Sequence, residues 1–240
     1  MSDESNLSQQ FTQDPSKYLC EPRRKDYYDH LYTEFNRLGI NNVVDIGCAS
    51  GDFLFLMPSH LNGLGIDVSN ELIQIARKTR SRPNLYYSQV DFFSQSFAQH
   101  VRNLPIRFDS IDAITLLGTL STLFDFRKAL TSCLSLSPKH IFINSWFNTH
   151  DIDVRCAYRR SDQPQAEFNY GFNIFSLATA KHHLDALGLK YNFAEYHMQN
   201  YLHKTDDALS SWHMFIGKDK VVTNGTGLIL KGFNLHIMCN

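Results

Sequence analysis

Two patterns of apolar and polar positions alternate along the middle of the chain. Short apolar runs, typical of buried strands, are separated by longer stretches in which apolar residues recur about every three or four positions, typical of helices that face a core. The predicted strands cover residues 42–46, 63–67, 85–89, 111–116 and 140–145. The predicted helices between them cover residues 53–61, 70–80, 93–102 and 126–136. This alternation predicts an α/β fold with a doubly wound, mostly parallel sheet and helices on both faces.

The chain before the first strand divides into a polar part and a helical part. Residues 1–16 are rich in Ser, Gln, Asp and Asn, and we expect a mobile tail or a lid that orders when a ligand binds. Residues 22–39 carry tyrosine, leucine and phenylalanine at helical spacing and end in Gly39, a residue that favours helix termination. The tyrosines of this predicted helix form either a packed face or a cover for the ligand.

The periodicity fades between residues 147 and 175, where polar and aromatic residues mix. Because this long connection directly follows the fifth predicted strand, we expect a substrate lid over the carboxyl edge of the sheet. A helix capped by Ser176 should follow, and then strands at 191–198 and 211–217. Residues 218–240 are interpreted as a C-terminal extension, whose strand material either widens the sheet or joins two copies in a homodimer.

Length, charge and cysteine content narrow the class of protein. The 240 residues suit one domain, which we place at 17–240, and the formal net charge of −1 offers no basic excess for binding nucleic acid. No apolar run is long enough to span a membrane, and the polar N-terminus lacks the apolar core of a secretion signal. The five cysteines include no C-x-x-C pair, so we expect reduced thiols in the cytoplasm and no cysteine zinc site.

The most informative stretch is the turn that follows the first predicted strand. Asp45 ends the strand, Gly47 and Gly51 allow a sharp turn, and a helix follows. A strand, a glycine turn and a helix in this order expose backbone N–H groups at a helix N-terminus, which is typical of nucleotide binding. About twenty residues after Gly47, Asp67 ends the second strand, at the spacing of an acid that accepts hydrogen bonds from ribose hydroxyls.

The spacing of the glycines separates this turn from a dinucleotide-binding loop. The turn has the pattern G-x-x-x-G, whereas a dinucleotide loop has G-x-G-x-x-G and uses its second glycine to approach a pyrophosphate. Ala49 stands at that second position. Asp45 would repel a pyrophosphate and suits a ligand with an ammonium group. A ligand that combines adenosine, an ammonium group and no phosphate is S-adenosylmethionine.

Four segments resemble, in chain order, the motifs of the class I S-adenosylmethionine-dependent methyltransferases. They are Asp45-Ile46-Gly47-Cys48-Ala49-Ser50-Gly51, then Gly65-Ile66-Asp67-Val68-Ser69, then Tyr86-Tyr87-Ser88-Gln89-Val90-Asp91-Phe92, and finally 111–120 with 123–125. The resemblance covers about residues 40–145. It implies a Rossmann-like, seven-stranded sheet with an antiparallel C-terminal strand, and a helix at 22–39 that covers the cofactor.

The resemblance implies S-adenosylmethionine as the cofactor, with its contacts at the strand ends. The methionine part would face Asp45 and the turn formed by Gly47, Cys48, Ala49, Ser50 and Gly51. The ribose would face Asp67, with Val68 beside it. The adenine would face Asp91 and Phe92, and the methyl group would lie above Leu117. Taken one at a time, each acid also fits a solvated carboxylate or a favourable charge at a helix N-terminus. Their common place at the ends of successive strands favours binding.

The chemistry of the reaction sets what the acceptor side must supply. Methyl transfer from a sulfonium is an in-line displacement that depends on alignment of the reacting atoms, so we expect no metal site. A general base helps when the acceptor is a weakly acidic hydroxyl. Candidate bases near the carboxyl edge are His150 and His197, for which an exposed or packed histidine is the alternative.

Arginines near the expected lid provide candidate substrate contacts. Their paired N–H donors suit a carboxylate or a phosphate, and a solvated basic face is the alternative. The candidate substrate-binding residues are Trp146, Arg155, Arg159 and Arg160. If they act in this way, the acceptor is an anionic small molecule.

The sequence therefore predicts a methyltransferase that acts on a small molecule, at an oxygen of an anionic metabolite or of a sugar or polysaccharide intermediate. Two other functions stay open at this point. One is a protein that binds S-adenosylmethionine without catalysis and acts as a regulatory or partner subunit. The other is a nicotinamide-dependent dehydrogenase of similar fold, which the residues of the glycine turn disfavour.

Overall fold

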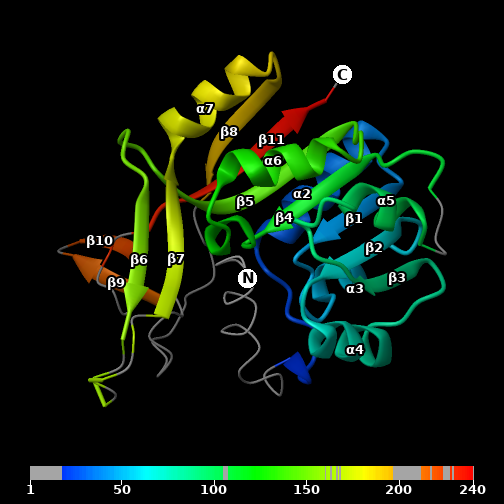
Figure 1. Cartoon of the computed structure of the whole chain (residues 1–240), viewed down its shortest axis with the longest axis horizontal. Helices are drawn as coiled ribbons and strands as arrows, with labels where there is room; N and C mark the ends of the chain where they lie inside the picture. Colours follow the sequence, from blue (N-terminus) through cyan, green and yellow to red (C-terminus); the bar gives the residue numbers. More distant parts are fainter. Residues whose placement is uncertain are drawn as a thin grey trace.

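A mixed β-sheet crosses the molecule and positions the site (Figure 1). The computed structural model describes residues 18–104, 108–159, 161–162, 164–165, 167, 169–196, 212–216, 218–223, 228 and 230–239. In spatial order the strands are β3 (Leu85–Gln89), β2 (Asn62–Asp67), β1 (Asn42–Ile46), β4 (Ala113–Leu117), β5 (His140–Asn148), β11 (Gly232–Met238) and β8 (Lys190–Tyr196). The first five are parallel to one another, which confirms the predicted doubly wound, mostly parallel sheet. The predicted tail at 1–16 lies outside the described residues.

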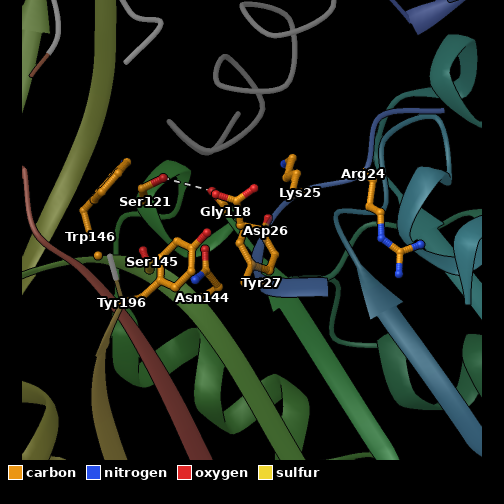
Figure 2. A pocket seen from close by; sticks show the side chains of 11 residues that line it. Arg24, Lys25, Asp26, Tyr27, Gly118, Ser121, Asn144, Ser145, Trp146 and Tyr196 are labelled. Carbon is orange, nitrogen blue, oxygen red and sulfur yellow. Dashed lines mark hydrogen bonds between the residues drawn. The ribbon is translucent and has the colours of Figure 1, made fainter. Parts of the chain in front are cut away.

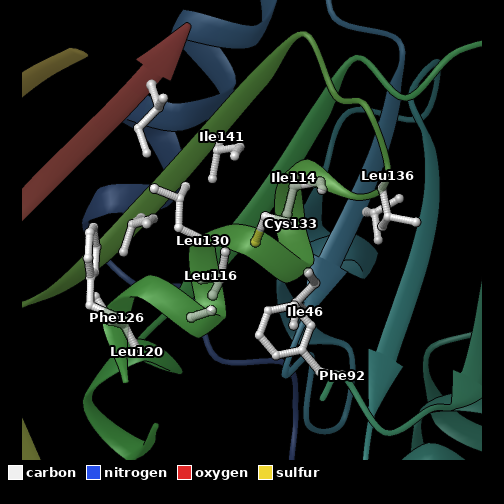
Figure 3. Packing of buried hydrophobic residues seen from close by; sticks show 14 of the residues in the cluster. Ile46, Phe92, Ile114, Leu116, Leu120, Phe126, Leu130, Cys133, Leu136 and Ile141 are labelled. Atoms are coloured by element: carbon white, nitrogen blue, oxygen red, sulfur yellow. The ribbon is translucent and has the colours of Figure 1, made fainter. Parts of the chain in front are cut away.

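Helices cover both faces of this sheet. The helices α5 (Phe97–Arg102), α6 (Phe126–Leu134) and α7 (Leu177–Ala186) pack on one face, and α2 (Tyr27–Leu38), α3 (Asp52–Leu56) and α4 (Asn70–Thr79) pack on the other. Side chains alternate along β1, so that Val44 and Ile46 enter the first core cluster (Figure 3) while Val43 enters the second. The Asp45 side chain follows the same alternation to the face covered by α2.

Three predicted helices are clearly shorter than their sequence patterns, whereas α4 and α6 end only slightly early. α3 ends at Leu56 because Met57 takes an extended conformation (φ −59°, ψ 151°) immediately before Pro58. α2 begins at Tyr27 and α5 at Phe97, each later than the pattern predicts. None of the helices in the described ranges combines the length and the apolar character needed to cross a membrane.

The C-terminal strand β11 lies inside the sheet. It runs antiparallel to β5 on one side and to β8 on the other, with Leu235 opposite both Ile143 and Phe193. An antiparallel strand was expected from the resemblance, but the apolar segment of 218–240 is that strand and not additional material. Since both of its backbone edges are already paired, β11 is an inner strand and adds no new edge to the sheet. The homodimer stays a prediction.

The segment 147–175, predicted as a substrate lid, contains a β-ribbon. Its role as a lid stays a prediction. β6 (Val154–Tyr158) and β7 (Asn169–Ser176) pair antiparallel, and β7 also pairs with the end of β5. The predicted strand at 211–217 is present as β9 (Trp212–Ile216), but it pairs with β10 (Asp219–Thr223) in a separate hairpin. Figure 1 shows the ribbon and this hairpin at the same end of the molecule. The predicted strand at 191–198 is β8, whose described part ends at Tyr196.

A small apolar cluster joins these additions to the sheet. Phe172 and Ile174 of β7 pack with Leu230, which bridges to Val222 of β10. Trp146, near the end of β5, packs against the same cluster. The ribbon therefore lies beside the carboxyl edge of the sheet and packs against the side chain of Trp146 at that edge.

Candidate cofactor and acceptor site

The turn after β1 is held in a strained but well-anchored conformation. Gly47 (φ 72°) and Gly51 (φ 81°) have left-handed backbones, and Ala49 between them also has a positive φ of 47°. The N–H groups of Gly47 and Cys48 both donate to the Ile66 carbonyl oxygen, at 2.8 and 3.0 Å. These bonds fix the turn against the carboxyl end of β2.

Side chains around this turn leave no room for a Cβ atom at either of its glycines. A Cβ atom on Gly47 would lie 2.3 Å from Oγ1 of Thr119, and a Cβ atom on Gly51 would lie 2.5 Å from the Tyr87 ring. The same ring lies 2.6 Å from a Cβ built on Gly65. Tyr87 thus fills the space beneath the turn, a role that the sequence analysis did not identify. The clue is the register of β2 and β3, which places Gly65 directly opposite Tyr87.

Asp67 is oriented by the turn that it supports. The N–H of Ala49 donates to its Oδ2 at 3.0 Å, and the N–H of Ser69 donates to its Oδ1 at 2.9 Å. Burial raises the pKa of this carboxyl, while these backbone donors act in the opposite direction. The Val68 N–H also bonds to this carboxylate. The two oxygens together have acceptor capacity for more than three donors, which suits a pair of adjacent hydroxyl groups. The next residue, Val68, is 43% exposed and offers an apolar surface beside the carboxylate.

Asp45 is a buried acid at the end of β1. It is 3% exposed, and the Thr115 hydroxyl donates to its Oδ1 at 2.6 Å. Burial raises the pKa of Asp45 to about 7, against the opposing effects of Thr115 and of the Lys25 ammonium group. A cationic ligand group that approached this carboxyl would stabilise its ionised form.

The remaining predicted cofactor residues lie in different surroundings. Asp91 is exposed and accepts the N–H of Phe93 at 2.9 Å. The Phe92 ring is only 8% exposed and packs 5.2 Å from the Phe97 ring. The Cys48 thiol and the Ser50 side chain are buried as well. Leu117 is partly buried at the end of β4 and packs against the cluster beneath α2.

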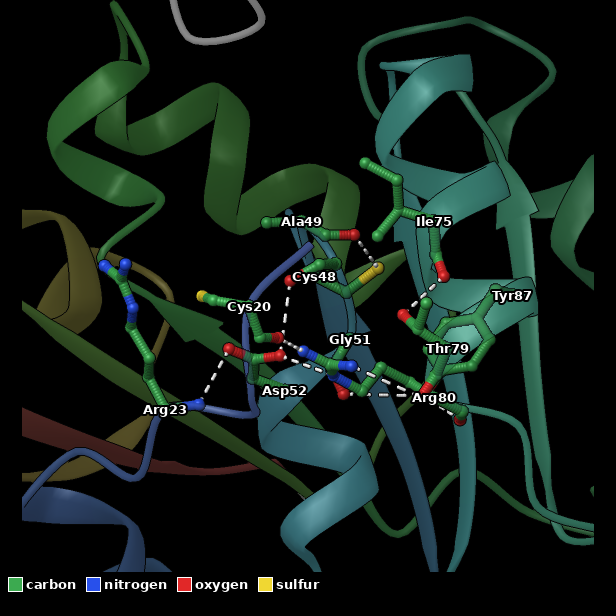
Figure 4. Close-up of polar contacts among 11 residues, drawn as sticks. Cys20, Arg23, Cys48, Ala49, Gly51, Asp52, Ile75, Thr79, Arg80 and Tyr87 are labelled. Atoms are coloured by element: carbon green, nitrogen blue, oxygen red, sulfur yellow. Dashed lines mark hydrogen bonds and ion pairs between the residues drawn. The ribbon is translucent and has the colours of Figure 1, made fainter. Parts of the chain in front are cut away.

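The segment before α2 is tied to the turn by one buried arginine (Figure 4). Arg80, which is 4% exposed, pairs with Asp52 at 2.9 Å and donates to the Cys20 carbonyl oxygen at 2.5 Å. The N–H of Arg23 donates to the other oxygen of Asp52 at 3.1 Å. Asp52 begins α3, so these contacts place the chain around residues 20–26 over the carboxyl edge of the sheet.

A cavity of about 360 Å³ opens between this segment and the sheet. It lies at the carboxyl ends of β4, β5 and β8, where ligands bind in open parallel sheets. A Cβ atom on Gly118, in its wall, would meet no atom within 4 Å, so the end of β4 faces open space. The wall is formed by Arg24, Lys25, Asp26, Tyr27, Gly118, Ser121, Asn144, Ser145, Trp146, Tyr196 and Gly232 (Figure 2).

The predicted acceptor-side residues do not all reach this cavity. Trp146 lies in its wall, whereas His150 is exposed in the turn after β5 and is not among the lining residues. The Arg155 guanidinium lies 4.9 Å from the Phe124 ring centroid and donates to the Phe124 carbonyl oxygen, so it is held by the protein itself. Arg159 is exposed in the ribbon. His197 and Arg160 lie outside the described residues.

Several lining residues were not identified from sequence. Lys25 and Asp26 precede a helix, where polar residues are ordinary, and Tyr196 ends a strand that lies far along the chain. Tyr196 reaches the cavity because β11 lies between β5 and β8 in the sheet. Lys25 and Asp26 reach it because Arg80 holds the segment before α2 over the sheet. Only the tyrosines of the predicted N-terminal helix had been considered as a cover, and Tyr27 is one of them.

Comparison with known proteins identifies the same fold. The family described as "Methyltransferase domain" matches residues 41–186. Magnesium protoporphyrin IX methyltransferase from Synechocystis PCC 6803 with bound S-adenosylhomocysteine is 10% identical, with a TM-score of 0.61 and 100% of both chains covered. A SAM-dependent methyltransferase from Methanosarcina mazei is 15% identical, with a TM-score of 0.54 over 83% of this chain and 92% of the other.

A third solved structure is an N-methyltransferase, NodS from Bradyrhizobium japonicum WM9 in complex with S-adenosylhomocysteine. It is 14% identical, with a TM-score of 0.50 and 98% of each chain covered. No curated protein sequence matches the chain at a significant level. At these identities the structural likeness establishes the fold and leaves the acceptor open.

Proposed function

Because the chain belongs to the methyltransferase-domain family and uses S-adenosylmethionine as its cofactor, we propose that it methylates an oxygen atom of a small anionic acceptor. The acceptor is a metabolite or a sugar or polysaccharide intermediate. The family match removes the nicotinamide-dependent dehydrogenase from consideration. The five free cysteines support the expected cytoplasmic location.

The residues at the strand ends fit the cofactor that the family uses. The glycine turn would hold the methionine part, with Asp45 opposite its ammonium group. Asp67, already oriented by two backbone N–H groups, would accept the ribose hydroxyls. The exposed Val68 and Asp91 would border the adenine. When bound, the cofactor supplies a methyl group on a positively charged sulfur, and the chain aligns that group with the acceptor.

The observation that carries the acceptor proposal is the cavity beside Gly118. It is bordered by the start of α2 on one side and by β5, β8 and β11 on the other, and its size suits a small molecule. Lys25 supplies a cationic group in its wall, and the aromatic residues Tyr27, Trp146 and Tyr196 supply apolar surface. The net charge of −1 offers no electrostatic attraction for nucleic acid.

A transfer assay with methyl-labelled S-adenosylmethionine tests this function. The purified chain should label small hydroxylated acids and leave RNA, DNA and unrelated proteins unlabelled. Labelled product of an anionic hydroxylated compound should resist mild acid and base, as expected for an ether. Transfer to an amine, or tight cofactor binding without transfer to any acceptor in a broad panel, would contradict the proposal. The second outcome would favour a non-catalytic partner subunit.

A further inference from the structure

Two asparagines form a polar pair on the sheet that floors the cavity. The Asn144 Nδ2 group donates to the Asn234 Oδ1 atom at 2.7 Å, and the register of β5 and β11 places the two residues directly opposite each other. Both side chains are partly buried. The next pair on this face is aromatic, since His236 stacks on Phe142 with ring centroids 4.4 Å apart. Amide groups in such surroundings cost free energy unless their hydrogen-bonding groups are used.

The bond between the two asparagines leaves the amide oxygen of Asn144 available to a ligand. Asn144 lines the cavity, and Figure 2 shows its side chain among the other lining residues. Its nitrogen is occupied by Asn234, and within the described part of the chain no donor bonds to its Oδ1 atom. A partly buried acceptor without a donor favours a ligand that offers an O–H or N–H group.

Asn144 also lies next to the place expected for the transferred methyl group. The register of β4 and β5 pairs it with Leu117, and its carbonyl oxygen accepts the Gly118 N–H at 2.8 Å. Thr115, two residues before Leu117 and therefore on the same face of the sheet, donates to Asp45. Neighbouring strands lie about 5 Å apart. A methyl group held above Leu117 by the proposed cofactor site would therefore lie beside the Asn144 amide.

Lys25 contributes to the same cavity from the opposite side. It belongs to the segment before α2, whereas Asn144 belongs to the sheet. An ammonium group suits an anion, while an amide oxygen repels an anion and needs a donor. The two residues therefore suit different parts of one molecule, an anionic group and a group that carries a hydrogen.

We propose that the Asn144 amide oxygen accepts a hydrogen bond from the acceptor hydroxyl and holds that oxygen in line with the methyl group, while a separate anionic group of the acceptor pairs with Lys25. This inference rests on the proposed function. The hydroxyl oxygen gives a lone pair to the methyl carbon while the carbon–sulfur bond breaks and leaves its electrons on sulfur. The hydroxyl proton passes to solvent, so an alcohol and a sulfonium become an ether, a thioether and a proton. Asn234 is a positioning residue that fixes the amide.

Sinefungin tests the place of the amide oxygen, because it carries an ammonium group where S-adenosylmethionine carries the methyl group. Calorimetry compares its affinity with that of S-adenosylhomocysteine, which has no group at that position. Asn144→Leu should weaken sinefungin binding about 10-fold, as expected for a lost hydrogen bond to a charged group, and change S-adenosylhomocysteine binding by less than about 2-fold. Asn144→Asp keeps an oxygen and adds a negative charge, so it should tighten sinefungin binding about 10-fold.

Asn192→Leu is the matched control. Asn192 pairs with His236 on the same face of the sheet, but it lies at the β8 edge and is not among the described lining residues. This variant should leave both affinities unchanged. Equal losses of the two ligands in Asn144→Leu, or an unchanged ratio of the two affinities in Asn144→Asp, would overturn the proposal. Tighter sinefungin binding to Asn144→Leu would show that the amide presents its N–H groups, and would overturn it as well.

The role in transfer is measured with the hydroxylated acid that the wild type labels. Asn144→Leu should lower kcat about 100-fold through misalignment and leave the KM for S-adenosylmethionine unchanged. Asn234→Ala should lower kcat about 10-fold, whereas Asn234→Asp keeps the oxygen that accepts from Asn144 and should retain most of kcat. An unchanged kcat in Asn144→Leu would overturn the inference alone. A wild type that binds no S-adenosylhomocysteine, or labels no acceptor, would overturn the proposed function and this inference with it.

Discussion

Replacing Asp45 by asparagine is expected to stabilise the cofactor-free protein at about pH 8 and to weaken S-adenosylmethionine binding by about 100-fold or more. Burial raises the pKa of Asp45 to about 7, whereas an aspartate in an unfolded chain titrates near about 4. The folded state therefore holds this proton more tightly, and its stability falls as pH rises between these two values. At pH values above about 7, the ionised Asp45 carboxylate lowers the free energy of unfolding by up to about 4 kcal/mol. Asparagine removes this cost and still accepts the Thr115 hydroxyl.

Urea denaturation at about pH 5 and about pH 8 measures the stability change, and calorimetry measures cofactor binding. The stabilisation of Asp45→Asn over wild type should be larger at the higher pH. Cofactor affinity of the wild type should fall below about pH 7, because protonated Asp45 cannot pair with an ammonium group, while the variant should show no such dependence. A variant less stable than wild type at about pH 8, or one with unchanged affinity, would refute this role.

Asp112→Asn is the matched control, because Asp112 is also a buried carboxylate but lies just before β4, away from the site. Burial acts to raise the pKa of Asp112, but Lys139 at 2.7 Å and the N–H groups of Asn41 and Asn42 outweigh this effect. The pKa of Asp112 is therefore lowered. A carboxyl group whose pKa is lower in the folded state than in the unfolded state stabilises the fold at pH values above its unfolded-state pKa. This stability is lost as the pH falls. Asp112→Asn should therefore destabilise the protein near neutral pH, opposite in sign to Asp45→Asn, and leave cofactor affinity unchanged.

Replacing Arg80 by methionine is expected to lower the free energy of unfolding by about 3 kcal/mol. The change leaves Asp52 partly buried without its cation and removes the donor to the Cys20 carbonyl oxygen. Urea denaturation measures the loss of stability. Hydrogen exchange should in addition show faster exchange at Arg23, whose N–H is bonded to Asp52.

Two further variants make the Arg80 prediction decisive. Arg37→Met removes an exposed ion pair with Glu34 and should leave the denaturation midpoint almost unchanged. The double variant Arg80→Met, Asp52→Leu should be less destabilised than the sum of the single changes, because no unpaired carboxylate is left behind. Equal effects of Arg80→Met and Arg37→Met would show that the buried pair does not hold the segment over the site.

The order of strands and helices and the two acids Asp45 and Asp67 could be predicted because they depend on local patterns. Apolar runs define the strands, glycines define the turn, and parallel strands bring their carboxyl ends to one edge. Trp146 was identified for the same reason, since it directly follows a predicted strand. These signals need no knowledge of distant contacts.

The features that could not be predicted depend on pairing between distant residues. The place of β11 between β5 and β8 is fixed by contacts such as Leu235 with Ile143, which no local pattern records. Lys25 acquires its role only because the segment before α2 is held over the sheet by Arg80. Arg155 was proposed as a substrate anchor from its place in the chain, but folding brings Phe124 beneath it.

Calorimetric titration with S-adenosylmethionine, comparing the wild type with Asp67→Ala, tests the central claim most directly. The wild type should bind with micromolar affinity. Asp67→Ala should bind about 100-fold more weakly, because it loses both the acceptor for the ribose and the anchor of the Ala49 N–H. Asp109→Ala, an exposed aspartate before β4, is the control and should bind as wild type does. A folded wild type that does not bind the cofactor, or Asp67→Ala with wild-type affinity, would contradict the account.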